Sequence, residues 1–203
     1  MSKKLFIFSL LIALISCDDT AKLQPLDSNA TILAFGDSLT YGTGSSRNDT
    51  YPAVLQRLTG RHIINAGKPG EITSKGLSRL PHLIEQHQPQ LIILCHGGND
   101  ILRKLNLDDT SNNIQQMIDI ARQSNSQVIL VGVPEFGLFL DTSPIYEKLA
   151  VENNIPIETD ALGDILGDNS LKSDHIHPNS RGYQILAEKI ELLLQQTGAI
   201  TAN

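Results

Sequence analysis

The chain has 203 residues, 40% of them hydrophobic, a size and composition that predict one globular domain rather than two. Its formal net charge is −6, which argues against binding nucleic acid through neutralisation of phosphates. Aromatic residues make up 4% of the chain and Trp is absent, so a carbohydrate-binding face of stacked rings is disfavoured.

The first residues have the layout of a secretory signal peptide. Lys3 and Lys4 precede an apolar run over 5–15, which is shorter than the roughly 20 residues that a membrane-spanning helix needs. Cys17 follows this run as in a bacterial lipobox, so we predict cleavage before Cys17 and its lipidation; the alternative is an ordinary signal peptide with an incidental cysteine. The lipid would hold the protein at a membrane surface facing the periplasm, and Asp18 resembles an inner-membrane retention signal of Gram-negative bacteria.

Residues 17–29 are predicted to form a tether, because they are polar, contain a proline and show no periodicity. The folded domain is predicted to cover residues 30–203. Cys95 is the only other cysteine of the chain, so lipidation of Cys17 would leave no partner for an intrachain disulfide.

From residue 31 onward, short apolar runs alternate with amphipathic stretches. Strands are predicted at 31–35, 62–66, 91–95, 127–132 and, from a weaker pattern, 155–159. Helices are predicted at 51–59, 74–87, about 109–123, 143–153 and 180–196. Unbroken apolar strands alternating with helices indicate an α/β protein, a three-layer α/β/α sandwich around a five-stranded parallel sheet.

Small and polar residues directly follow the first three predicted strands, at 36–38, at Gly67 and at 97–100. In an open parallel sheet the carboxyl ends of the strands share one edge, and ligands bind outside that edge. The sequence therefore predicts a functional site there.

Ser38 lies within this predicted edge, in the segment GDSLTYG (36–42) after the first strand. A serine at a strand-to-helix junction can act as a nucleophile stabilised by backbone N–H groups of the helix. It can equally be a helix cap or turn residue, and this segment alone does not decide between the two readings.

A second polar segment, SDHIHPN (173–179), lies near the C-terminus. Asp174 and His177 are three residues apart, so Asp174 can accept the Nδ1–H of His177 and leave its Nε2 free to take a proton from Ser38. Two alternatives remain: a metal site that includes His175, for which the sequence offers no convincing further ligands, or a solvated surface turn.

Four segments, in order, resemble the sequence blocks of the SGNH (GDSL) hydrolase family. They are GDSLTYG at 36–42, Asn65-Ala66-Gly67 with Gly70, HGGND at 96–100, and the segment from Asp174 to Pro178. The stretch 77–89 further resembles the bacterial periplasmic thioesterase, lysophospholipase and arylesterase branch. His96 and His175 stand where other residue types are usual in these relatives.

The resemblance implies a flavodoxin-like fold and a role for each matching residue. Ser38 would be the nucleophile, His177 the general base and then acid, and Asp174 its orienter. The backbone N–H groups of Ser38 and Gly67 and the side-chain amide of Asn99 would form the oxyanion hole. Since the sequence contains no P-loop, dinucleotide fingerprint or metal motif, no cofactor and no metal are predicted.

The segment 134–141 is too apolar for an ordinary solvated loop. Phe136, Leu138 and Phe139 are predicted to bind substrate by lining an acyl pocket, and the alternative is that they only cover the sheet.

The predicted function is hydrolysis of acyl esters or thioesters through an acyl-Ser38 intermediate, with lipid-derived substrates such as lysophospholipids. The substrate would be a small molecule, the enzyme a monomer, and its location the bacterial cell envelope. Two alternatives stay open at this point: an esterase that removes O-acetyl groups from an envelope polysaccharide, and a non-catalytic lipoprotein that binds ligands.

Overall fold

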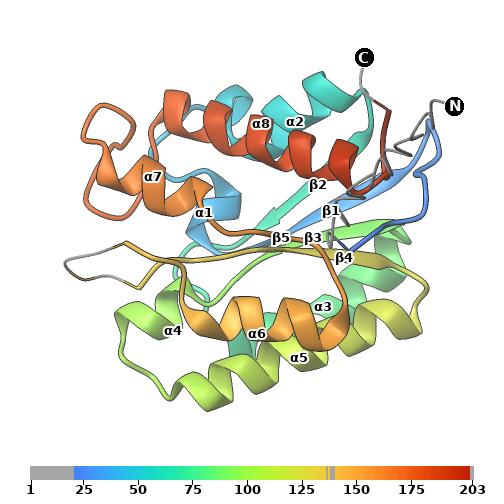
Figure 1. Ribbon diagram of the computed structural model, residues 1–203, viewed down its shortest axis with the longest axis horizontal. Helices are drawn as coiled ribbons and strands as arrows, with labels where there is room; N and C mark the ends of the chain where they lie inside the picture. Colours follow the sequence, from blue (N-terminus) through green and yellow to red (C-terminus); the bar gives the residue numbers. More distant parts are fainter. Residues whose placement is uncertain (1–20, 136, 138–139, 202–203) are drawn as a thin grey trace, which may run out of the picture.

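The computed structural model describes residues 21–135, 137 and 140–201 as an α/β sandwich with three layers (Figure 1). The middle layer is a five-stranded sheet in the order β2-β1-β3-β4-β5, and every neighbouring pair is parallel. The strands are β1 (Thr31–Gly36), β2 (His62–Gly67), β3 (Leu91–Cys95), β4 (Gln127–Val131) and β5 (Ile157–Glu158). The predicted fold class is therefore confirmed.

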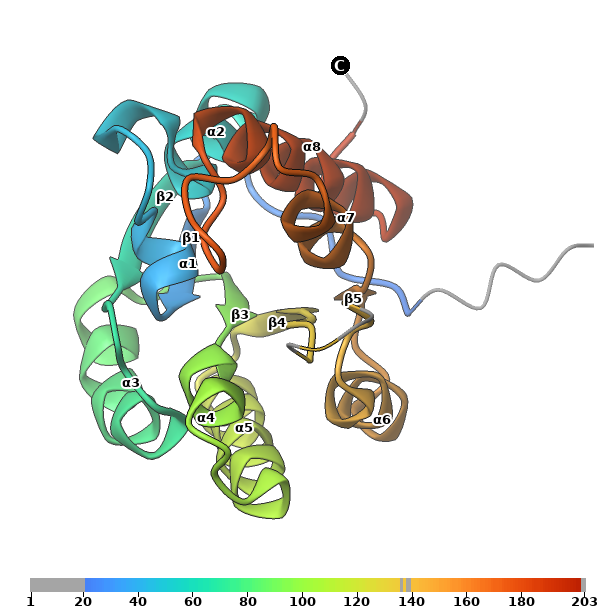
Figure 2. The ribbon, with the colours of Figure 1, turned by 90° about the vertical axis from the view of Figure 1, so that its left-hand side faces the viewer.

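Helices cover both faces of the sheet in Figures 1 and 2. One face carries α1 (Ser38–Tyr41), α2 (Tyr51–Thr59), α7 (Ala161–Gly167) and α8 (Ser180–Gln196). The other carries α3 (Thr73–His87), α4 (Gly98–Leu102), α5 (Leu107–Gln123) and α6 (Pro144–Asn153). A short 3₁₀ helix, Arg47–Asp49, lies between α1 and α2. Within the described ranges, no helix combines the length and the apolar character needed to cross a membrane.

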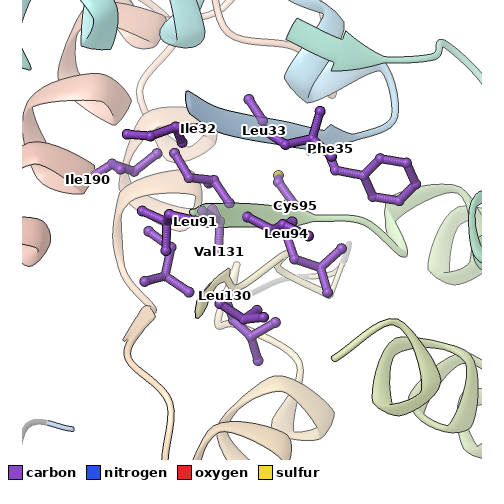
Figure 3. Packing of buried hydrophobic residues seen from close by; sticks show 14 of the residues in the cluster. Ile32, Leu33, Phe35, Leu91, Leu94, Cys95, Leu130, Val131 and Ile190 are labelled. Carbon is purple, nitrogen blue, oxygen red and sulfur yellow. The ribbon is translucent and has the colours of Figure 1, made fainter. Parts of the chain in front are cut away.

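The hydrophobic core lies on both sides of the central strands. Every residue of β3 is buried, and in β1 only Thr31 is partly exposed. Figure 3 shows side chains of this core from β1, β3, β4 and α8. Burial on both faces explains why these strands are continuous apolar runs rather than alternating ones.

The observed elements differ from the predicted ones in two respects. β5 has only two residues, 157–158, where five were predicted at 155–159. The helices α1, α4 and α7 were not predicted, because four to seven residues are too few to establish a helical period. The longer predicted helices agree with the observed ones to within about two residues, as expected of helix ends.

Part of the predicted tether lies against the domain. The backbone N–H groups of Leu23 and Leu26 donate to the carbonyl oxygens of Thr197 and Ala199, at 2.9 and 2.8 Å. The Leu26 side chain is buried in the core. The folded part of the chain therefore begins several residues before residue 30.

Candidate active site

The strands β1, β2 and β3 end in register with one another at one edge of the sheet, and this edge positions the site. Gly36 of β1 is in register with Gly67 of β2 and with Cys95 of β3. The residues that follow these strands therefore meet, as predicted for the carboxyl edge of a parallel sheet. Residues of the segments that follow β1, β2 and β3 form part of the candidate site.

Ser38 is the first residue of α1 and is held by the residue before it. Asp37 caps this helix, since its Oδ1 accepts the backbone N–H of Leu39 at 3.0 Å. Asp37 is buried, whereas Ser38 is partly exposed. The cap thus fixes the strand-to-helix junction, with Ser38 at the partly exposed start of the helix.

His177 links Ser38 to Asp174, although His177 and Ser38 are 139 positions apart in the sequence. The Nε2 atom of His177 lies 3.0 Å from Ser38 Oγ, and its Nδ1 lies 2.8 Å from Asp174 Oδ2. The other carboxylate oxygen of Asp174 accepts the backbone N–H groups of Ile176 and His177, both at 2.9 Å. This local turn places the carboxylate and the imidazole side by side.

The charge on Asp174 determines which nitrogen of a neutral His177 carries the proton. Desolvation opposes ionisation of Asp174, but the hydrogen bonds from His177 and from backbone N–H groups outweigh it and lower the pKa of this carboxyl. An ionised carboxylate can only accept hydrogen bonds, so Nδ1 of His177 must be the donor. Nε2 is then a free acceptor facing the Ser38 hydroxyl, which is the arrangement needed to deprotonate a serine.

Asn99, in the first turn of α4, belongs to the segment that follows β3 and contacts the segments that follow β1 and β2. Its Nδ2 group donates to Asp37 Oδ2 at 3.2 Å and to the backbone carbonyl of Glu71 at 3.1 Å. Burial raises the pKa of Asp37, and the hydrogen bonds from Leu39 and Asn99 act in the opposite direction. These contacts fix the Asn99 amide close to Ser38, and both residues line the same small pocket.

Gly67 lies where β2 meets α1 and cannot be replaced by a residue with a side chain without movement. A Cβ atom at this position would stand 2.0 Å from the backbone nitrogen of Tyr41. The N–H of Gly67 donates to the side-chain oxygen of Asn65 at 3.0 Å. The Gly67 and Asn99 donors therefore both have acceptors within the protein, and an incoming oxyanion would have to share or replace them.

The neighbour of Asn99, Asp100, anchors α4 to the helices beside it. Its buried carboxylate accepts the N–H of Thr73 at 2.9 Å and the Thr73 hydroxyl at 2.6 Å. Asn113 of α5 donates to the same hydroxyl at 3.0 Å. This network holds the N-termini of α3 and α4 together and so supports the position of Asn99.

A charged cluster around the buried Glu71 carboxylate lies beside the site and was not predicted from the sequence. Arg79 of α3 donates to Glu71 Oε2 at 2.6 Å and lies over the Phe35 ring, 4.5 Å from its centre. His96 Nδ1 accepts the N–H of Gly97, so His96 Nε2 is the donor in its contact of 3.4 Å with Glu71. Gly76 leaves space for the His96 ring, because a Cβ there would stand 2.3 Å from Nε2.

The cluster predicts an acid-dependent loss of stability. Desolvation by burial raises the pKa of Glu71, but hydrogen bonds from His96 and Arg79 and the Arg79 charge outweigh it and lower the pKa from 4.5 to about 2. Because the folded-state pKa is below the ordinary value, this stabilisation is present above pH 4.5 and is lost as the pH falls towards 2.

Urea unfolding of the native protein and of Glu71→Gln measures this contribution. At neutral pH we expect the variant to be less stable by about 3 kcal/mol, since the partly buried guanidinium of Arg79 loses its carboxylate partner. The difference in unfolding free energy between the native protein and the variant should shrink as the pH falls from 4.5 to about 2. A difference that does not change with pH would contradict the assignment, and the exposed Glu85→Gln serves as control.

The small pocket at Ser38 has apolar as well as polar walls. It is lined by Asp37, Ser38, Leu39, Gly98, Asn99, Leu102, Ile176 and His177. The apolar members lie far apart in the sequence, and sequence reasoning did not single them out. The predicted acyl-pocket residues Phe136, Leu138 and Phe139 lie outside the described residues, as does Cys17.

The alternative prediction of a metal site that includes His175 is not supported by the arrangement of the described side chains. His175 is exposed, next to Asp174 in the turn. Over residues 21–135, 137 and 140–201, no group of three or more His, Cys, Asp or Glu side chains is arranged to hold a metal ion.

Comparisons with known proteins agree with the fold and the sequence blocks. Residues 34–185 match the profile of the GDSL-like Lipase/Acylhydrolase family. The thioesterase 1/protease 1/lysophospholipase L1 of Escherichia coli strain K12 is 30% identical, over 81% of this chain and 83% of that protein. An arylesterase of Vibrio mimicus is 28% identical, over 77% of this chain and 84% of its own.

Solved structures show the same architecture. The crystal structure of TesA superposes with a TM-score of 0.74 at 27% identity, over 82% of this chain and 99% of that chain. The esterase EstA of a Pseudoalteromonas species superposes with a TM-score of 0.73 at 22% identity, which supports the fold alone. With a matching profile over three quarters of its length and these relatives, the chain belongs to the GDSL-like lipase/acylhydrolase family and is an esterase of the SGNH type.

Proposed function

We propose that this enzyme hydrolyses acyl esters or thioesters through an acyl intermediate on Ser38. The observation that carries the proposal is the chain of contacts from Asp174 through His177 to the Ser38 hydroxyl, at 2.8 and 3.0 Å. These separations are hydrogen-bond distances, as a nucleophile, its base and the orienter of that base require.

The reaction follows from the protonation states of this chain of contacts. Ser38 Oγ attacks the carbonyl carbon of the substrate while its proton moves to His177 Nε2, and Asp174 stabilises the imidazolium. Nε2 then gives this proton to the leaving alcohol or thiol as the tetrahedral adduct collapses to an acyl-serine. A water molecule repeats the two steps on the acyl-serine, releasing a carboxylic acid and restoring Ser38.

The proposed oxyanion hole comprises the N–H groups of Ser38 and Gly67 and the side-chain amide of Asn99. Such donors act because they are already aligned before charge develops on the substrate oxygen. The two contacts of Asn99 Nδ2, to Asp37 and to the Glu71 carbonyl, hold the amide beside Ser38, and the oxyanion would share or replace one of them.

Replacing Asn99 with Ala tests this part of the proposal. We expect kcat to fall by about 10²- to 10³-fold with little change in KM, since the lost donor acts mainly in the transition state. Steady-state hydrolysis of p-nitrophenyl butyrate measures both constants. The exposed Asn112→Ala on α5 is the matched control, and equal activity of the two variants would remove Asn99 from the oxyanion hole.

We further propose lipid-derived acyl substrates. The relative named as a thioesterase/lysophospholipase supports this class, and Leu39, Leu102 and Ile176 give the small pocket at Ser38 apolar walls. The sequence around Cys17 supports anchoring of the enzyme by lipid at the bacterial cell envelope, facing the periplasm, where such substrates occur in the membrane. We propose that it acts there as a monomer.

A further inference from the structure

A basic groove lies next to the proposed active site, on the side of β2 and α3. It encloses about 530 Å³ and is formed by the segment that follows β2, the first turns of α3 and the end of α4. Its lining residues are Lys68, Pro69, Gly70, Glu71, Ile72, Lys75, Ser78, Arg79 and Arg103. Four of these side chains are cationic and one is a carboxylate, in a protein whose net charge is −6.

The groove and the pocket at Ser38 have no lining residue in common, but they adjoin along the chain at two places. Lys68 directly follows Gly67, and the carbonyl of Glu71 accepts a hydrogen bond from Asn99. On the other side, Leu102 lines the pocket at Ser38 and the next residue, Arg103, lines the groove. The groove therefore borders the pocket at Ser38, on the side of Gly67 and Leu102.

The positive charge of the groove is only partly neutralised. Arg79 is held by Glu71, and Lys68 lies 3.5 Å from the same carboxylate. Arg103 donates to the carbonyl of Gly70 at 2.8 Å, a contact that positions its guanidinium without cancelling its charge. Lys75 and Arg103 are both exposed. Glu71 is shared between Arg79 and Lys68, so the charge of Lys68 is neutralised only in part. Together with the charges of Lys75 and Arg103, it gives the groove a positive charge that favours binding of an anion.

We propose that the groove binds a phosphate group carried by the leaving part of the substrate. Lysine and arginine side chains around a concave site are the usual donors to phosphate oxygens. The phosphate can come from a lysophospholipid headgroup or from a phosphopantetheine carrier such as coenzyme A, because both offer the same chemistry. The inference rests on the proposed function and adds to it the charge of the preferred substrate.

The test compares two pairs of substrates. All four substrates carry the same acyl chain, lauroyl, and are used below their aggregation concentrations. Lauroyl lysophosphatidic acid is paired with monolauroylglycerol, and lauroyl-coenzyme A with the lauroyl thioester of N-acetylcysteamine. In each pair only the first member carries phosphate. The measured quantity is the ratio of kcat/KM for the phosphate-bearing substrate to kcat/KM for its uncharged partner.

In Lys75→Gln we expect this ratio to fall about fivefold, the effect of one surface charge, and to be restored in Lys75→Arg. The control is Lys148→Gln on α6, which lies beyond α5 from α3 in Figure 2 and should leave the ratio unchanged. A fall confined to the lysophosphatidic acid pair identifies a lipid headgroup as the ligand. A fall confined to the coenzyme A pair identifies the carrier.

Unchanged ratios in both pairs would overturn the inference. The Ser38→Ala variant, measured on the same four substrates, separates that outcome from failure of the proposed function. If Ser38→Ala is inactive throughout and Lys75→Gln leaves both ratios unchanged, only the phosphate groove is excluded. If Ser38→Ala still hydrolyses the uncharged substrates, the proposed mechanism fails and the inference that rests on it is withdrawn.

Discussion

Replacing Ser38 with Ala is expected to lower kcat for ester hydrolysis by about 10⁵- to 10⁶-fold, the loss seen when a serine nucleophile is removed. The structure gives the reason, because the Ser38 hydroxyl is the group that faces His177 Nε2. Without it, His177 has no serine proton to take and no acyl intermediate can form on residue 38. Hydrolysis of p-nitrophenyl esters from acetyl to palmitoyl measures the loss and the preferred chain length together.

The variant must be shown to be folded for this result to count. Ser38 is partly exposed and is not a core residue, so removal of its hydroxyl leaves the core intact, and the thermal unfolding temperature should match that of the native protein. Ser111→Ala on α5 provides a matched control and should retain full activity. A folded Ser38→Ala enzyme with more than a few per cent of native activity would rule out the proposed nucleophile.

Asp174→Asn is expected to lower kcat by about 10⁴-fold while leaving the turn intact. The side-chain oxygen of an asparagine can still accept the backbone N–H groups of Ile176 and His177, as Asp174 Oδ1 does. Its amide group, in place of Oδ2, would donate to Nδ1 of His177. The proton of the imidazole would then reside on Nε2, which could no longer accept the proton of Ser38.

The substrate KM of the variant separates this effect from a general loss of structure. Asp164→Asn, an exposed position on α7, serves as the control and should keep native activity. Because the tautomer and not the fold is altered in Asp174→Asn, its substrate KM should remain close to the native value. A variant that keeps native kcat would show that Asp174 does not orient His177.

Much of the fold could be predicted because its signals are local. The apolar runs of β1 and β3 are unbroken, and α3, α5 and α8 each carry an apolar face, so element types and the parallel sheet follow from the pattern. The short helices gave no such signal, and the weaker pattern at 155–159 indicated β5 but not its length of two residues. The docking of Leu26 could not be foreseen either, since it depends on contacts with the far end of the chain.

The site was predicted only in part, for a related reason. Ser38, Asp174 and His177 stand in segments whose residue types indicate their chemistry, and the structure brings these three together. The contact of Glu71 with His96 joins residues 25 positions apart, and no local pattern marks it. A histidine between a fully apolar strand and two glycines was the one available signal that His96 is buried.

The basic groove shows the same limit. Lys68, Lys75 and Arg103 are ordinary surface residues in the sequence, spread over 36 positions. Only the packing of the β2–α3 segment against α4 places them around one hollow. Long-range contacts of this kind, rather than residue types, decide which charges act together.

The most direct test of the proposed mechanism is covalent labelling with an alkyl fluorophosphonate, followed by intact mass measurement and peptide mapping. The reagent reacts with an activated serine hydroxyl and displaces fluoride, so it reports on the nucleophile without assuming a substrate. We predict one adduct per chain, located on Ser38, absent in Ser38→Ala and formed much more slowly in Asp174→Asn. An adduct on another serine, or equal labelling of Ser38→Ala, would contradict the assignment of Ser38 as the nucleophile.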